Sequence, residues 1–357
     1  MSNEVVQRRS PSVKFLTVAQ TAKAETPNLS KQRAKNRAVK SDQRTMSDAN
    51  AACAAATDDI RAYEIIASFA PFGGVTEERF DIICSATNDR QPSTPENEAR
   101  IDTIWKDRVR RNPSLFNGTK FRFSGVRQSA PMHEKIIIDL GITCYKDFLG
   151  TNCAPNNWYE FGAENLASPL GNAAIVETID QKVVLLKRSQ NVGECPDTIV
   201  CPGGHAEPKV IGIKSMEDWK QISKSKDPTK ESDSTDRNTC RTIRHELFDA
   251  MVREVVEETG IPRCKLGSMK CIGFTERVVN KRPDIIFHIQ CSITAEEVHK
   301  LYADGPEHEY ESTELITMNR DEFLKKVLDD NSINMPGCHR GGVALYRDYV
   351  AYQNDNV

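Results

Sequence analysis

The sequence predicts an α/β/α sandwich with a mixed sheet, preceded by an accessory α+β region and a disordered N-terminal tail. Short apolar runs typical of strands occur on both sides of the segment 247–256, whose apolar residues recur at helical spacing. A Gly-Gly turn follows the third of these runs, well before the helical segment. Because strands precede and follow one central helix, we expect the sheet to be mixed.

The N-terminal residues 1–58 form a polar segment with almost no aromatic side chains. Within it, residues 1–46 carry ten Lys and Arg against three Asp and Glu, a balance of +7, which leaves −10 for the rest of a chain whose total is −3. A segment that buries so little apolar area cannot offset its ordering entropy, so we expect disorder. An organelle transit peptide, or a basic tail that touches RNA or an anionic membrane, is the alternative.

Charge and cysteine content limit the partners and the compartment. An acidic globular part is unsuited to neutralising nucleic-acid phosphates, and no apolar run approaches the length of a membrane span. The eleven cysteines include no Cys-x-x-Cys pair, which favours a reducing compartment over a disulfide framework. We therefore expect a cytoplasmic protein that binds neither nucleic acid nor membrane. The sequence leaves the oligomeric state open.

Residues 62–166 are expected to form the accessory region. Glu96–Arg111 has the apolar spacing of an amphipathic helix, which Asn112-Pro113 ends. Lys120–Phe123 and Lys135–Leu140 have patterns typical of strands. The stretch Leu140–Asn152 is rich in aromatic residues and glycine, and we expect it to be an aromatic loop.

Residues 168–353 are expected to form the main domain. Alternating and apolar runs predict strands, and capping and periodic patterns predict later helices. A polar insert, about 209–238, is expected to be a solvated, flexible excursion; a substrate lid, with Met216 and Trp219 as its apolar contacts, is the alternative. Besides the central helix, the expected elements are Ala173–Ile179, Lys182–Lys187, Thr198–Cys201, Met269–Val279, Asp284–Ile293, Thr294–Tyr302, Glu314–Met318, Asp321–Leu328 and Gly342–Tyr352.

Three glutamates carry the predicted chemistry. Positions i, i+3 and i+4 share a helix face, so Glu254, Glu257 and Glu258 present three carboxylates to one place. Mg²⁺ binds carboxylate and phosphate oxygens and would relieve the repulsion between them. A solvated acidic face is the alternative. Gly260 and Pro262 end the helix.

Together with Arg253 and the upstream Gly-Gly turn, these residues resemble the Nudix box. The pattern Arg-Glu-apolar-x-Glu-Glu-x-Gly-apolar is matched at every position from Arg253 to Ile261. The first half of the box departs from the family, because Gly204 and Arg253 lie 49 positions apart. His245 stands where the family has its first glutamate, and Glu246 lies one residue off. Whether the usual ion pair to the arginine forms is therefore left open.

The resemblance to the Nudix family implies hydrolysis of a nucleoside diphosphate derivative with Mg²⁺ as cofactor, for which Mn²⁺ can substitute. Backbone at Gly203 and Gly204 can approach phosphate closely because glycine lacks a Cβ. Glu311, in a loop before a late strand, is the candidate general base. The family pattern assigns metal binding to Glu254, Glu257, Glu258 and the carbonyl of Gly203, and support of the loop to Arg253.

Further residues are candidates for binding the substrate. Lys187 and Arg188 end a strand before the Gly-Gly turn and could neutralise a diphosphate, with a solvated strand end as the alternative. Arg277 and His205 are other candidates for contacting phosphate. Core packing is the alternative for one member of the proposed nucleotide pocket, Phe148. The candidates for that pocket, from the aromatic loop, are Tyr145, Phe148 and Asn152.

Longer stretches resemble one branch of the family, the animal hydrolases specific for UDP-glucose and UDP-galactose. This resemblance extends over about 97–349 and implies cleavage of a UDP-hexose to UMP and hexose 1-phosphate. A Nudix pyrophosphatase for coenzyme A or ADP-ribose, and a non-catalytic module that binds a nucleotide sugar, are the alternatives. The stretches are Ile101–Trp105, Pro113–Phe116, Tyr145–Asn152, Cys201–Pro208 and His245–Phe248.

Overall fold

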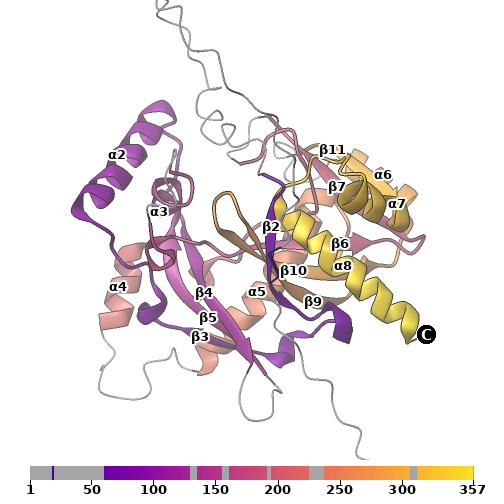
Figure 1. The fold of residues 1–357 in the computed structure, drawn as a ribbon, viewed down its shortest axis with the longest axis horizontal. Helices are drawn as coiled ribbons and strands as arrows, with labels where there is room; N and C mark the ends of the chain where they lie inside the picture. The colour runs from indigo at the N-terminus through magenta and orange to yellow at the C-terminus, as the bar shows by residue number, and fades with distance from the viewer. Residues whose placement is uncertain are drawn as a thin grey trace, which may run out of the picture.

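The computed structural model describes residues 18–19, 60–128, 135–154, 161–190, 194–224, 237–305 and 312–356. Two sheets with their helices occupy opposite sides of the view in Figure 1. Of the N-terminal tail, a short strand, β1 (Val18–Ala19), is described, and it pairs with β2. The predicted disorder of the rest of 1–58 lies outside the described residues.

The larger sheet is mixed, as the sequence predicts. Its order is β1-β2-β9-β10-β6-β7-β11, with β8 paired to β7. β10 runs parallel to β6, with Asp284 opposite Gly171, and the other neighbours run antiparallel. One strand of the predicted accessory region, β2, lies in this sheet. The strands are β2 (Tyr63–Ser68), β6 (Gly171–Glu177), β7 (Lys182–Arg188), β8 (Ile199–Val200), β9 (Leu266–Arg277), β10 (Arg282–Cys291) and β11 (Ser312–Asn319).

Helices cover both faces of the larger sheet, which confirms the sandwich. α5 (Arg237–Thr259) packs its apolar side chains on one face and α8 (Gly337–Asp355) on the other. Successive residues of a strand face opposite sides; accordingly Ala174 of β6 packs in the core under α5, and Ala173 in the core under α8. Both helices are longer than their sequence patterns indicate.

Two shorter helices complete this part of the fold. α6 (Ala295–Ala303) follows Thr294, which is its N-cap residue as predicted, and the side chain of Glu297 completes a capping box with it. The predicted helix 321–328 is divided into α7 (Arg320–Leu324) and a π-helical turn at Lys325–Asp329. No helix in the described ranges combines the length and the apolar character needed to cross a bilayer. Short 3₁₀ turns lie at Ala70–Phe72, Glu77–Arg79, Ala86–Asn88, Ala163–Asn165, Pro208–Ile211 and Arg263–Lys265.

The smaller sheet has the order β3-β5-β4, with β3 parallel and β4 antiparallel to β5. The expectation of an aromatic loop at 140–152 is wrong, because β5 extends to Cys144 and a helix, α3, follows at once. All residues from Leu140 to Cys144 are buried, and they stay paired with Phe123 to Thr119 of β4. The elements here are β3 (Phe80–Cys84), α2 (Pro95–Arg111), β4 (Thr119–Gln128), β5 (Ile136–Cys144) and α3 (Tyr145–Gly150).

The first half of the insert is folded, contrary to the prediction of a solvated excursion. It forms α4 (Met216–Lys224), which lies against the smaller sheet in Figure 1. Ile213 and Trp219 are 1% and 3% exposed and join the core that contains β4 and β5. The Trp219 indole N–H also donates to Asp89 Oδ2 at 2.6 Å. Burial of Ile213 and Trp219 therefore stabilises the folded conformation of this half of the insert despite its polar composition. Residues 225–236 lie outside the described part.

Candidate active site

The Gly-Gly turn lies against the C-terminal half of α5. The N–H of Gly203 donates to Glu258 Oε2 at 2.9 Å, and the N–H of His205 donates to Glu254 Oε1 at 3.2 Å. On its other side the turn is joined to β6, where the N–H of Gly204 donates to Asn172 Oδ1 at 2.7 Å. The turn is thus fixed between the sheet and two of the three box glutamates.

Both glycines of the turn occupy positions with no room for a side chain. A Cβ on Gly203 would lie 2.3 Å from the carbonyl oxygen of Asn172. A Cβ on Gly204 would lie 1.9 Å from Glu254 Oε1. Only glycine lets the backbone pass this close to the helix carboxylates.

Arg253 is paired with Glu246, so the ion pair that the sequence left open is present. The guanidinium donates to the two oxygens of Glu246 at 2.8 and 3.1 Å, and to Asp249 Oδ2 at 2.8 Å. Glu246 is 5% exposed and also accepts the N–H of Glu207 at 3.1 Å. His245 lies elsewhere, with its ring nitrogen 3.5 Å from Glu77. Glu246 therefore fastens the segment after the turn to the helix.

The three box glutamates supply the oxygen ligands that a hard divalent cation prefers. Glu258 is buried, whereas Glu254 and Glu257 are partly exposed. In their contacts with the turn, Glu254 and Glu258 each use one oxygen, and a carboxylate has about four lone-pair sites. The three carboxylates and the adjacent backbone carbonyl of Gly203 form a set of oxygen donors that fits Mg²⁺.

A second group of potential ligands is less suited to a cation. Among the described residues, Asp284, Cys338 and His339 bring their ligand atoms within 4.8 Å of one another. Arg282 Nη2 lies 3.6 Å from Asp284 Oδ1, and Arg277 Nη2 lies 3.7 Å from Cys338 Sγ. Burial raises the pKa of the Cys338 thiol to about 12, and metals bind the thiolate. Two guanidinium groups and a protonated thiol oppose binding of a metal ion.

A cavity of about 440 Å³ lies between the smaller sheet and the segment after the Gly-Gly turn. Burial lowers the pKa of the Lys120 ammonium there, and the carboxylates of Glu207 and Glu254 oppose this effect. Because Glu254 of α5 affects the pKa of Lys120, the cavity lies near the box helix. The lining residues are Phe116, Gly118, Thr119, Lys120, Tyr145, Glu207, Lys209 and Lys214.

The three residues predicted for the nucleotide pocket have different surroundings. Tyr145 lines the cavity, with its ring edge-on to Trp105 at 6.4 Å between centroids. Phe148 is 5% exposed, in agreement with the core-packing alternative. Asn152 is also buried, and its amide donates to the Asn280 carbonyl at 2.8 Å. Phe148 and Asn152 are therefore not part of the cavity lining, and Asn152 ties α3 to the β9–β10 connection.

Arginines surround Glu194 next to the turn. Arg282 Nη1 pairs with Glu194 Oε2 at 2.7 Å, and Arg188 Nε donates to the Glu194 carbonyl at 3.1 Å. Arg277 lies 3.6 Å from the same carboxylate but is 1% exposed. Arg188 thus lies near the turn as expected, whereas Arg277 is buried and held by protein groups.

His205 lies 3.4 Å from Arg282, measured from Nε2 to Nη2. Burial holds the pKa of His205 well below its usual range, and the positive charges of Lys120, Arg282 and Arg188 lower it further. The imidazole is therefore neutral near pH 7 and can accept a hydrogen bond. The contact of His205 with a substrate phosphate stays a prediction.

Among the predicted residues that the structure describes, Lys187 is not brought to the turn. Lys187 lies within the β7–β11 ladder opposite Glu314, and because neighbouring strand residues face opposite sides it diverges from Arg188. Glu311 lies outside the described residues, so its role as a general base stays a prediction.

Four residues at or near the site were not singled out from the sequence. Asn172 had a usable signal, since it is a polar residue in a strand that is otherwise apolar and buried. Phe116 ends one of the stretches that carry the family resemblance, which was also a usable signal. Lys120 and Arg282 had none, because they come from segments that only the fold brings to the box helix.

The chain is similar to several known proteins over most of its length. The chain is 37% identical over 288 residues to Nudix hydrolase 9 of Arabidopsis thaliana, which covers 76% of this chain and 87% of that protein. It is 28% identical over 298 residues to the mouse uridine diphosphate glucose pyrophosphatase NUDT22, covering 80% and 90%. The bovine protein of that name is 31% identical over 289 residues, covering 77% and 93%.

No protein-family model matches the chain. Among solved structures, it is similar to the MutT protein from Methanosarcina mazei Go1, with 16% identity, a TM-score of 0.28, and coverage of 52% of this chain and 94% of that one. It is also similar to a NUDIX hydrolase from Nitrosomonas europaea, with 16% identity, a TM-score of 0.29, and coverage of 51% and 88%.

Proposed function

The chain belongs to the Nudix hydrolase family, and from this premise we propose that it hydrolyses the diphosphate of UDP-glucose or UDP-galactose to UMP and hexose 1-phosphate. The observation that carries the proposal is the contact of Glu254 and Glu258 with the Gly203–His205 turn. The named activity of the mouse and bovine relatives, which match most of the chain, supports the uridine sugar substrate.

In this proposal Glu254, Glu257, Glu258 and the carbonyl of Gly203 hold Mg²⁺, or Mn²⁺ in its place. When bound, the ion neutralises phosphate charge and lowers the pKa of a bound water. The residues of the chain set the geometry, because Arg253 and Glu246 hold the turn against α5 before substrate arrives. Preorganisation of this kind is the main requirement of phosphoryl transfer.

The substrate diphosphate lies between the turn and the cavity in the proposed complex. Attack of one water on phosphorus breaks one P–O bond of the bridge, and the leaving phosphate oxygen takes the electron pair. Arg188 and Arg282 supply positive charge near the turn, and the neutral His205 can accept a hydrogen bond there. Tyr145 offers its ring to the nucleotide.

The test is release of UMP from UDP-glucose by the full-length protein with Mg²⁺. We expect release that EDTA abolishes, and no cleavage of coenzyme A or ADP-ribose under the same conditions. Cleavage of one of those compounds instead would retain the hydrolase and replace the substrate. Tight binding of UDP-glucose without turnover would overturn the catalytic proposal in favour of a binding module.

A further inference from the structure

Arg282, the first residue of β10, is held in place by two acidic side chains. Its Nη1 pairs with Glu194 Oε2 at 2.7 Å, and its Nη2 lies 3.6 Å from Asp284 Oδ1. Asp284 is fully buried, and the Arg282 side chain is 13% exposed. A Cβ on Gly171 of the neighbouring strand would lie 2.6 Å from Nη2, so this side of the guanidinium is enclosed as well. The guanidinium therefore has a fixed position.

From this position Arg282 contacts the imidazole of His205, with 3.4 Å between Nη2 and Nε2. A guanidinium carries N–H donors and no acceptor, so a hydrogen bond between the two groups requires a lone pair on Nε2. In a neutral imidazole, the hydrogen bond made by one ring nitrogen decides which nitrogen carries the proton. The contact with Arg282 therefore places the proton of His205 on Nδ1.

The Nδ1 atom lies on the side of the ring nearest its own backbone, and this backbone is fixed at the box helix. The N–H of His205 donates to Glu254 Oε1 at 3.2 Å. The preceding residue, Gly204, donates its N–H to the side chain of Asn172 and accepts the N–H of the same residue at 3.0 Å. Because Nδ1 is joined to Cα through Cβ and Cγ alone, it stays close to this backbone and to Glu254.

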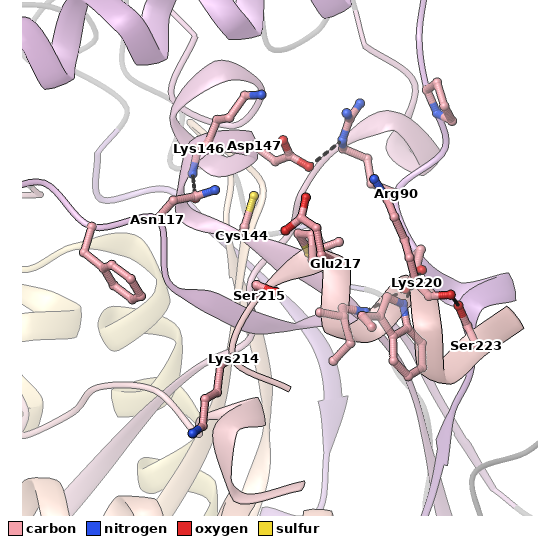
Figure 2. Close-up of a pocket in the computed structure, with 16 residues that line it drawn as sticks. Arg90, Asn117, Cys144, Lys146, Asp147, Lys214, Ser215, Glu217, Lys220 and Ser223 are labelled. Atoms are coloured by element: carbon pink, nitrogen blue, oxygen red, sulfur yellow. Dashed lines mark hydrogen bonds and ion pairs between the residues drawn. The ribbon is translucent and has the colours of Figure 1, made fainter. Parts of the chain in front are cut away.

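The Nδ1–H of His205 is available to a ligand. Within the described residues, the contact with Arg282 is the only hydrogen bond of the His205 side chain, and the residue is partly exposed. A charged group at the neighbouring cavity of about 600 Å³ between α3 and α4 differs in this respect. There Arg90 Nε donates to Asp147 Oδ2 at 3.2 Å, as Figure 2 shows. The unused donor therefore lies at the Gly-Gly turn.

We infer that His205 donates its Nδ1–H to a non-bridging oxygen of the substrate diphosphate, and that Arg282 is the positioning residue that fixes this tautomer. The inference rests on the proposed function and adds to it a hydrogen-bond donor of defined direction. Negative charge is redistributed over the phosphate oxygens as water attacks, and a donor fixed in advance stabilises it without reorganisation. The proton stays on Nδ1 throughout, so no bond of the imidazole breaks.

The tautomer is measured first, by NMR of the ring nitrogens in full-length, substrate-free protein with isotope-labelled histidine. The signals that disappear in His205→Asn belong to His205. We expect the proton on Nδ1 in the wild type, and its transfer to Nε2 in a large fraction of Arg282→Met. A proton on Nε2 in the wild type, or protons on both nitrogens, overturns the inference. An unchanged tautomer in Arg282→Met overturns the role of Arg282.

Asparagine and glutamine at position 205 separate the two ring nitrogens, because the Asn amide takes the place of Nδ1 and the Gln amide that of Nε2. For cleavage of UDP-glucose, we expect His205→Asn to keep most of kcat and His205→Gln to lose about a hundredfold. The KM should change little, because the donor acts on the transition state. His245→Asn and His245→Gln, at a side chain that is 69% exposed, are the matched controls and should both equal wild type. Equal kcat in His205→Asn and His205→Gln overturns the donor role.

A double-mutant cycle tests whether Arg282 acts through His205. We expect Arg282→Met to lower kcat strongly in the wild type and much less when His205 is already glutamine. Equal losses in the two backgrounds would mean that Arg282 acts directly on the phosphate, and would overturn the positioning role. Thermal unfolding checks that each variant folds. If Arg282→Met does not fold, the wild-type tautomer and the comparison of asparagine with glutamine decide the inference.

The outcomes also separate this inference from the proposed function, because the tautomer is measured without substrate. A wild-type protein with its proton on Nδ1 that does not cleave UDP-glucose would refute the function and support the assigned tautomer. Cleavage of UDP-glucose by a protein whose His205 carries its proton on Nε2 would support the function and refute the inference.

Discussion

Arg253 and Glu246 lie two helical turns apart on α5 and are joined by hydrogen bonds of 2.8 and 3.1 Å. Seven residues of α-helix turn through roughly 700°, about 20° short of two full turns, so the two side chains share a face. His245, one residue further away, is about 80° round the helix. Glu246 can pair with Arg253, although it is displaced by one residue from the family position, because both belong to the continuous helix α5.

Glu246→Gln should therefore loosen the turn. Arg253 loses a buried charged partner, so we expect about 1–3 kcal/mol lower stability, together with reduced kcat/KM for UDP-glucose. Thermal unfolding and steady-state kinetics measure the two effects. His245→Ala, at a side chain that is 69% exposed, is the neighbouring control and should be close to wild type. Equal behaviour of the two variants would contradict the role given to Glu246.

Glu258→Gln should abolish most of the activity without unfolding the protein. The amide oxygen can still accept the Gly203 N–H, but a charged metal ligand is lost and repulsion within the box falls. We expect at least about a hundredfold lower kcat with an unchanged or higher Tm. Glu322→Gln, at an exposed ion pair with Lys326, serves as the control. Near-normal turnover in Glu258→Gln would show that the metal assignment is wrong.

Gly204→Ala tests the close approach of the turn to the helix. The new methyl group would coincide with the present position of Glu254 Oε1, so this carboxylate must move. We expect a large loss of kcat with a modest change in Tm. Gly125→Ala adds a Cβ that meets nothing within 4 Å and should leave both unchanged. Full activity in Gly204→Ala would mean that the observed place of Glu254 is not needed.

Trp219→Phe should produce a pH-dependent loss of stability. Burial raises the pKa of Asp89, whereas the Ile142 N–H and the Trp219 indole lower it. A carboxyl whose pKa is raised by folding contributes stability below its unfolded pKa, about 3.9, and that contribution is lost as the pH rises through the folded pKa. Removing the indole donor raises the pKa further. The loss of Tm should therefore be larger near pH 7 than near pH 4.

The control for this pH effect is the same substitution in an Asp89→Asn background. Without the titrating carboxyl, Trp219→Phe should lower the Tm by the same amount at both pH values. An equal loss at the two pH values with Asp89 present would show that the indole does not act through this carboxylate.

Deletion of residues 1–58 should leave kcat and Tm nearly unchanged. Its described contribution to the fold is β1, whose two residues pair with Ile65 and Glu64 at the edge of the larger sheet. Activity and thermal unfolding of the truncated chain measure the effect. A large loss of either would mean that the tail packs on the domain.

The sequence by itself determined the features that depend on local spacing. Although β1 and β2 were not predicted, helical spacing placed Glu254, Glu257 and Glu258 on one turn, Thr294 was expected to cap α6, and six strands of the larger sheet, β6 to β11, were expected close to their observed bounds. Each rests on residues a few positions apart, whose geometry is set by the backbone repeat.

Only the tertiary structure decided the features that join distant segments. The insert folds because Trp219 finds a core built by β4 and β5, and composition cannot reveal a partner so far along the chain. Glu246 pairs with Arg253 because α5 runs without a break from Arg237 to Thr259 and so holds both residues in one helix. Phe116 and Lys120 line one cavity with Glu207 because the smaller sheet packs beside the segment that follows the Gly-Gly turn. Such contacts depend on packing between elements, which no local pattern encodes.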